Sequence, residues 1–204
     1  MAIQSASDGR IREGYSARAA EYTGLFGDIA QMDAVDRERI GGWADGIDGR
    51  LLDAGCGPGH WTAFLVERGA AAEGIDLVPE FISTAVARFP RVPYRVASLL
   101  DADLDDGSLG GVLAWYSLIH ASPGELPVLL AAARSALRHG GGLLVGFFDG
   151  PDGEPFPHAV TTAHHWSVDG MSALLKSAGF SVVDSETRVQ SGRRPHASVS
   201  AIAV

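Results

Sequence analysis

The chain has 204 residues, of which 46% are hydrophobic and 20% charged, and this composition excludes a disordered or fibrous protein and predicts one folded domain. Its net charge of -9 opposes the attraction that draws proteins to the nucleic-acid backbone, so we expect no nucleic-acid partner. No apolar run approaches the ~20 residues of a membrane span, the N-terminal segment lacks a signal-peptide pattern, and the single cysteine excludes an internal disulfide. We therefore expect a cytoplasmic protein with no membrane partner.

The N-terminal residues 1–48 have a helical pattern. Apolar residues recur at helical spacing in two segments: Tyr15, Ala19 and Tyr22 in the first, and Val35, Ile40 and Trp43 in the second. We predict that residues 1–48 form helices, that residues 49–204 form the core, and that both belong to one domain.

From Arg50 onward, short apolar runs alternate with helical segments. The runs expected as strands are residues 50–55, 71–76, 92–97, 110–116 and 141–148. Pro79 marks the first turn of one helix, and Ser122 caps another that we expect to end at His139 and Gly140. This alternation predicts a parallel sheet with helices on both faces.

The C-terminal part changes character. Residues 149–166, rich in Pro, Gly and His, are predicted to form a loop. A helix follows, capped by Ser167 and ended by Gly179. The last two strands, residues 180–189 and 196–204, are joined by a short turn and should pair antiparallel.

A glycine-rich turn, "RLLDAGCGPGHW", follows the first strand of the core. Its glycines allow a sharp turn and a close approach of a ligand to the backbone. The dinucleotide-binding pattern G-x-G-x-x-G is not satisfied, because His60 follows Gly59, and the Gly-Lys-Ser/Thr ending of a P-loop is missing. Asp53 at the strand end would repel phosphates and suits a cation or a hydroxyl donor.

A second carboxylate, Asp76, ends the next strand. This is the usual place for a side chain that accepts both ribose hydroxyls of a nucleotide. A ligand that has a ribose but no pyrophosphate, and that carries positive charge, fits these residues, and S-adenosylmethionine is such a ligand.

With these features the sequence resembles the class I S-adenosylmethionine-dependent methyltransferases, in particular the small methyltransferase domain 11/25-like enzymes. Six stretches carry the resemblance in the right order: "LLDAGCGPG", "GIDLVPEFI", "ASLLD", "GGVLAWYSLIH", "RHGGGLLVGF" and "LLKSAGF". The resemblance implies a three-layer, Rossmann-like α/β fold in which the helices of residues 1–48 form a lid over the cofactor. Its seven-stranded sheet would be mostly parallel, with an antiparallel C-terminal hairpin strand and the order 3-2-1-4-5-7-6.

The resemblance also implies a cofactor site for S-adenosylmethionine, with S-adenosylhomocysteine as the product. Asp76 would hold the ribose, and the backbone of Gly55 and Gly57 would pack on the methionine part. The family often has an acidic residue at or near Ser98, whereas the nearest one here is Asp101. The predicted cofactor-binding residues are Tyr15, Asp53, Ala54, Gly55, Cys56, Gly57, Gly59, Trp61, Asp76, Leu77, Ser98, Leu99, Trp115, Tyr116 and Ser117.

The acceptor site is less defined, and we expect the loop of residues 149–166 and the N-terminal helix to form its pocket. We predict acceptor contacts at Tyr22, His120, His158 and Arg193, with His120 or Tyr22 as the general base if the acceptor must lose a proton. For Tyr15 and Tyr22, core packing is the alternative. The histidines of residues 158–165 lack a convincing third ligand, so no metal is expected.

Several alternatives stay open. The acceptor atom can be oxygen, nitrogen or carbon. The missing Asn/Asp-Pro-Pro-Tyr/Phe box disfavours adenine or glutamine amino groups, which leaves a small-molecule acceptor. A protein that binds S-adenosylmethionine or S-adenosylhomocysteine without catalysis is the main rival function, and an NAD(P)-dependent oxidoreductase is a weaker one. The protein is expected to be a monomer or a homodimer.

Overall fold

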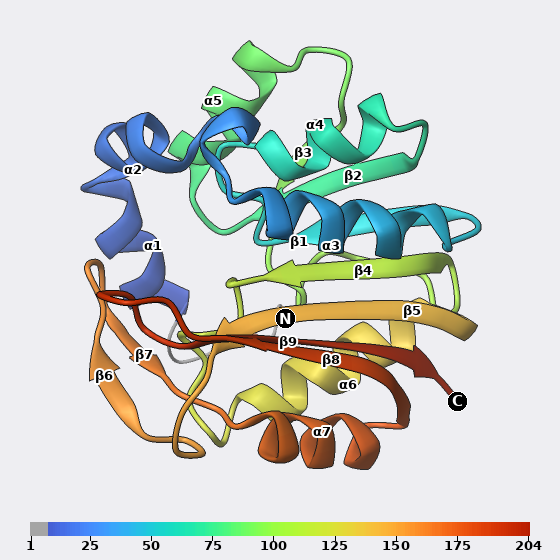
Figure 1. Ribbon diagram of the computed structural model, residues 1–204. Coiled ribbons are helices and arrows are strands. Elements are labelled where there is room, and N and C mark those ends of the chain that lie inside the picture. Colours follow the sequence, from blue (N-terminus) through green and yellow to red (C-terminus); the bar gives the residue numbers. More distant parts are fainter. Residues whose placement is uncertain (1–7) are drawn as a thin grey trace.

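The computed structural model describes residues 8–204, in which helices cover both faces of a seven-stranded sheet (Figure 1). The first seven residues of the predicted lid lie outside the described part. The strands of this sheet are β1 (Arg50–Ala54), β2 (Ala71–Asp76), β3 (Tyr94–Val96), β4 (Leu109–Trp115), β5 (Leu137–Phe148), β8 (Phe180–Arg188) and β9 (His196–Ala203).

The strand order is β3-β2-β1-β4-β5-β9-β8, with β1 to β5 parallel and β9 antiparallel to both of its neighbours. The predicted fold is confirmed. The labels differ from the predicted numbering only because two further short strands, β6 (Pro155–Pro157) and β7 (Thr162–His164), form a separate hairpin.

The two faces of the sheet bury different clusters because successive strand residues point to opposite sides. Leu51 packs with α3 (Ala34–Asp45) and α4 (His60–Glu67) on one face. Leu52 packs in the large cluster with α6 (Leu126–Ala136) and α7 (Val168–Ser177) on the other. Both leucines are at most 1% exposed.

Four local predictions need correction. The helix expected over 122–139 is shorter, because Leu137 already pairs with Leu109 as the start of β5. Ser122 does not cap it; the Ser122 backbone N–H and hydroxyl instead donate to Glu125 in the preceding turn. The predicted loop 149–166 contains the β6–β7 hairpin. Finally, Tyr15 and Tyr22 lie on two helices, α1 (Asp8–Ser16) and α2 (Ala19–Phe26).

The other local predictions hold. The Ser167 hydroxyl caps α7 by accepting from the Gly170 N–H at 2.9 Å. The helix α5 (Pro79–Arg88) begins at its proline. No helix within residues 8–204 is both long and apolar enough to cross a bilayer.

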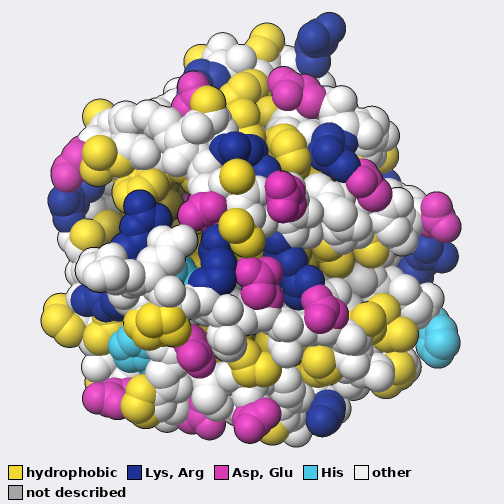
Figure 2. All heavy atoms as spheres, in the orientation of Figure 1, with side chains coloured by type: hydrophobic (Ala, Val, Ile, Leu, Met, Phe, Trp, Pro, Cys, Tyr) yellow, Lys and Arg dark blue, Asp and Glu magenta, His cyan; other side chains and the backbone are white. Residues whose placement is uncertain are grey.

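On the face that carries α3, acidic and basic side chains are interspersed rather than separated by sign (Figure 2). Ion pairs join α3 to β8: Arg39 with Asp184, and Arg188 with Asp36. These ion pairs tie α3 to the edge strand of the sheet.

Candidate active site

The glycine turn between β1 and α4 is held against the end of β2. The backbone N–H groups of Gly55 and Cys56 both donate to the Ile75 carbonyl, at 2.8 and 2.9 Å. Gly55 has a φ of 82°, and a Cβ at this position would lie 2.2 Å from the Cβ of Ser117. Only glycine fits there, because the turn and the end of β4 approach each other at the backbone.

Asp76 lies beside this turn at the end of β2. Its two carboxylate oxygens accept backbone N–H groups from Gly57 at 2.8 Å and from Val78 at 2.9 Å. Burial raises the pKa of Asp76 to about 6, so the carboxylate is ionised at neutral pH. Each oxygen retains a lone pair for a further donor.

Asp53 does not face a cavity. Its side chain is 2% exposed and accepts a hydrogen bond from the Thr62 hydroxyl at 2.7 Å, which ties β1 to α4. Burial raises its pKa to about 7. Gly59 is also outside the cavities, since a Cβ there would meet Ala85 and Tyr94 within 2.8 Å. The geometry therefore gives these two predicted cofactor contacts structural roles.

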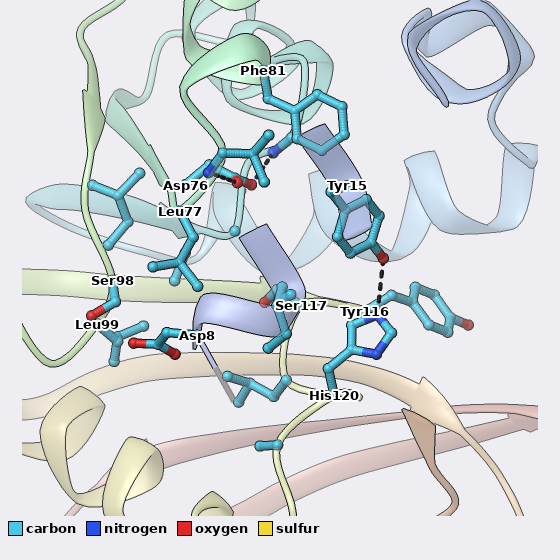
Figure 3. A pocket seen from close by; sticks show the side chains of 18 of the residues that line it. Asp8, Tyr15, Asp76, Leu77, Phe81, Ser98, Leu99, Tyr116, Ser117 and His120 are labelled. Carbon is cyan, nitrogen blue, oxygen red and sulfur yellow. Dashed lines mark hydrogen bonds between the residues drawn. The ribbon is translucent and has the colours of Figure 1, made fainter. Parts of the chain in front are cut away.

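A cavity opens above the carboxyl ends of β1, β2 and β4, and we call it the strand-end cavity (Figure 3). It brings together most of the predicted cofactor-binding residues: Tyr15, Ala54, Gly55, Gly57, Asp76, Leu77, Ser98, Leu99, Trp115, Tyr116 and Ser117. The predicted acceptor contacts Tyr22 and His120 also line it. Sequence reasoning missed others, among them Asp8, Ile11 and Phe81, because nothing in their local pattern distinguishes them from ordinary helix residues.

His120 connects the lid to the sheet. Its Nδ1 lies 2.8 Å from the Thr162 carbonyl oxygen and its Nε2 lies 2.9 Å from the Tyr15 hydroxyl, which it faces in Figure 3. A carbonyl only accepts, so Nδ1 carries the proton and Nε2 accepts the proton of Tyr15. Burial lowers the pKa of His120, which keeps the imidazole neutral. Both nitrogens are thus engaged.

A second and larger cavity, of about 560 Å³, adjoins the first. We call it the aromatic cavity, after lining residues such as Trp61, Tyr116, Phe148 and His196. The two cavities meet at shared residues: Tyr15, Tyr22, Gly55, Gly57, Trp115 and Tyr116. Burial raises the pKa of the Tyr22 hydroxyl to about 12, so Tyr22 brings a neutral phenol to this junction.

The predicted residues divide between the cavities. Among the predicted acceptor contacts, His158 and Arg193 line only the aromatic cavity, Tyr22 lines both cavities, and His120 lines only the strand-end cavity. Cys56 and Trp61, predicted to bind the cofactor, line only the aromatic cavity.

Tyr116 occupies the junction in an unusual conformation. Its φ of 55° is left-handed, which is uncommon for a residue other than glycine and clusters at functional sites. Its hydroxyl lies 2.5 Å from Nδ1 of His196, a residue 80 positions later that the sequence did not single out. Figure 3 shows the Tyr116 ring directed away from His120.

Within residues 8–204, no group of three or more His, Cys, Asp or Glu side chains is arranged to hold a metal ion. His158 instead packs against His120 and Phe148, with ring centroids 5.2 and 6.0 Å apart. His165 stacks on Phe156 at 4.2 Å.

Comparison with known proteins agrees with this architecture. A family model described as "Methyltransferase domain" matches residues 51–141. An uncharacterized methyltransferase of Mycobacterium tuberculosis is 29% identical over 156 residues, which cover 68% of this chain. The chain spans 64% of the length of that relative.

Two solved structures share the fold over the whole chain. The 1,6-didemethyltoxoflavin-N1-methyltransferase of Burkholderia thailandensis, with bound 1,6-didemethyltoxoflavin and S-adenosylhomocysteine, has a TM-score of 0.76 at 22% identity, covering 100% of this chain and 93% of that one. The [4+2]-cyclase SpnF has a TM-score of 0.81 at 17% identity, covering 100% and 99%. At these identities the likeness concerns the fold.

Proposed function

This chain belongs to the class I S-adenosylmethionine-dependent methyltransferases, and on that premise we propose that it transfers a methyl group from S-adenosylmethionine to a small-molecule acceptor. One observation carries the proposal. The Asp76 carboxylate and the glycine turn lie in a cavity that joins, through aromatic side chains, a second cavity with room for another molecule.

The strand-end cavity fits the parts of this cofactor. Asp76 offers lone pairs to the two ribose hydroxyls, as expected at the end of β2. Leu77, Ser98 and Leu99 provide a mixed apolar and polar lining for the adenine. Gly57 leaves open space, because a Cβ there would meet nothing nearer than the Tyr22 ring at 3.9 Å.

The junction suits the positive charge of a sulfonium. Tyr15, Tyr22, Trp115 and Tyr116 surround it, and aromatic faces attract cations by about 0.5–2 kcal/mol each. When bound, the cofactor supplies an electrophilic methyl group. The task left to the protein is to hold the acceptor in line with that methyl group and to exclude water, a positioning role that needs few catalytic groups.

The hydrogen bonds of His120 support a role other than the general base predicted from the sequence. Since Nδ1 donates to Thr162 and Nε2 accepts from Tyr15, His120 has no free nitrogen for the acceptor. We propose that His120 is a positioning residue, which holds Tyr15 of α1 over the strand-end cavity. Tyr22, His158 and Arg193 remain the proposed acceptor contacts from the sequence.

Binding of S-adenosylhomocysteine tests the cofactor assignment directly. We expect calorimetric binding of S-adenosylhomocysteine and none of NADH. Asp76→Ala should weaken binding by ~1–3 kcal/mol, the scale of a lost hydrogen bond to a charged group, whereas Glu38→Ala on the exposed face of α3 should leave it unchanged. Unchanged affinity in a folded Asp76→Ala protein would contradict the ribose assignment.

A protein named as a [4+2]-cyclase shares this fold, which shows that the fold is not restricted to methyl transfer, so the alternative function from the sequence, a protein that binds the cofactor without catalysis, keeps its own test. Release of S-adenosylhomocysteine from S-adenosylmethionine across a panel of small molecules separates the two. Tight binding of S-adenosylhomocysteine with no release across the panel would favour the non-catalytic binder.

A further inference from the structure

The aromatic cavity has a composition that indicates what it binds. Ten of its 25 lining residues are Phe, Trp, Tyr or His, whereas these four types make up 23 of the 204 residues of the chain. The rings come from segments far apart in sequence, for example Phe26 of α2, Trp61 of α4, Phe148 of β5 and His158 of the hairpin. Core packing alone does not explain this concentration of aromatic rings, because the rings line open space.

The charges around this cavity largely compensate each other. Arg18 pairs with Glu21 at 2.7 Å, and Arg188 pairs with Asp36. Arg193 is the remaining cation of the lining, and its side chain is exposed. A strongly charged acceptor would therefore find little uncompensated charge, whereas a flat neutral one would find ring faces and edges for stacking.

The cavity also contains polar atoms without partners. Both ring nitrogens of His60 are buried and make no hydrogen bond within residues 8–204, although the residue is only 6% exposed. A buried polar group of this kind normally has a partner, so its position in a cavity lining points to a ligand with polar atoms. Burial lowers the pKa of His60 to about 4, so this imidazole is neutral.

His196 is another histidine of the aromatic cavity lining, and it also lines a small neighbouring cavity beside Asp36 and Arg188. Tyr116 holds Nδ1 of its ring, and Phe148 packs against the ring with centroids 5.3 Å apart, so the imidazole has a defined orientation. In the described part of the chain Nε2 makes no hydrogen bond. A hydroxyl both donates and accepts, so it can pair with Nε2 in either tautomer.

We propose that the acceptor is a flat aromatic molecule with a ring hydroxyl, that the aromatic cavity stacks its rings, and that Nε2 of His196 hydrogen-bonds the hydroxyl. This inference rests on the proposed function for the identity of the other substrate, and it assigns the acceptor class and a new contact residue. Tyr116 is then a positioning residue that orients His196.

Three related molecules test the proposal: 7-hydroxycoumarin, coumarin and octahydrocoumarin. They differ in one hydroxyl and in aromaticity, and each would be titrated by calorimetry into the protein saturated with S-adenosylhomocysteine. We expect 7-hydroxycoumarin to bind about tenfold more tightly than octahydrocoumarin, and coumarin to lie between them. Equal affinity for the saturated and the aromatic molecules would overturn the acceptor class.

The hydroxyl contact is tested by His196→Phe, which keeps a ring in place. In this variant 7-hydroxycoumarin and coumarin should bind within about twofold of each other, and Tyr116→Phe should reduce the difference between them in the same direction. His139→Phe, at an exposed position of β5 outside the cavity, is the matched control and should change nothing. A hydroxyl advantage that survives in His196→Phe would refute the contact.

The same experiment separates this inference from the proposed function. Binding of S-adenosylhomocysteine without a preference for aromatic molecules overturns the inference alone. Failure of S-adenosylhomocysteine to bind overturns the proposed function, whatever the coumarins do in its absence.

Discussion

The strand-end cavity and the aromatic cavity share a wall but are built in different ways. The first uses backbone N–H groups, glycines and one carboxylate at the ends of adjacent strands, where the sheet fixes every position. The second combines strand residues such as Phe148 and His196, which pair directly between β5 and β9, with side chains from α1, α2, the hairpin and the turn before β9, which the sheet does not align. Such segments can change without altering the sheet, so one scaffold can keep its cofactor while its acceptor differs.

Polar contacts also connect the lid to the hairpin. His120, in the loop after β4, bonds to Tyr15 of α1 and to Thr162 of β7. Arg18, between α1 and α2, also donates to the Ala159 carbonyl of the hairpin. The lid and the hairpin are therefore tied to each other and to the sheet through a few polar contacts.

Among the substitutions, the largest effect on stability and on cofactor binding is expected at the turn after β1, where the sheet itself forms the strand-end cavity. Gly55→Ala places a methyl group 2.2 Å from the Cβ of Ser117 at a φ of 82°. We expect a loss of about 2–5 kcal/mol in the free energy of unfolding, from left-handed strain and overpacking together, and no binding of S-adenosylhomocysteine. Denaturant unfolding and calorimetry measure the two effects.

Gly57→Ala is the matched control for that change. Its φ of 54° carries similar strain, but the new methyl group would meet only Tyr22, at 3.9 Å. The expected loss is about 1–2 kcal/mol, from strain alone. An equal loss of unfolding free energy in the two variants would show that the close approach of the turn to Ser117 does not contribute to the cost of Gly55→Ala.

A smaller effect concerns the buried acid beneath the strand-end cavity. With a pKa of about 7 in the folded protein, Asp53 binds a proton in the native state between pH 4 and 7 that it lacks when unfolded. Its contribution to the free energy of unfolding therefore falls as the pH rises through this window. Above the window this contribution no longer changes with pH.

The Asp53→Asn protein should lose this slope. Between pH 5 and 8 the difference in free energy of unfolding from the parent should change by about 1–3 kcal/mol, since one proton corresponds to about 1.4 kcal/mol for each pH unit. The amide can still accept from Thr62, and any cost of its unpaired N–H groups is independent of pH. Parallel stability curves for the two proteins would mean that Asp53 does not titrate in this range.

The sequence predicts the strand-end cavity better than the aromatic cavity, because the first is built at the strand ends and the second is built by segments that are far apart in the sequence. The sheet and the residues of the strand-end cavity follow from short motifs, since Gly55 and Gly57 lie in the turn directly after β1 and Asp76 ends β2. The roles of His196 and Phe148 cannot be read from the sequence around them, because they arise only where segments far apart in the sequence meet. The burial of Asp53 was also missed, because its motif does not reveal that the side chain turns toward Thr62.

The smallest effect is expected at the link between the regions. Tyr15→Phe removes the proton donated to Nε2 of His120, so α1 should detach more often while the sheet stays intact. We expect faster amide hydrogen exchange in residues 8–26 and an affinity for S-adenosylhomocysteine lower by about 0.5–1.5 kcal/mol, the net value of one hydrogen bond, with unchanged exchange in β1 and β4. Tyr22→Phe is the control, because the Tyr22 hydroxyl makes no hydrogen bond within residues 8–204. If both variants accelerated exchange equally, ring packing rather than the Tyr15–His120 bond would hold the lid.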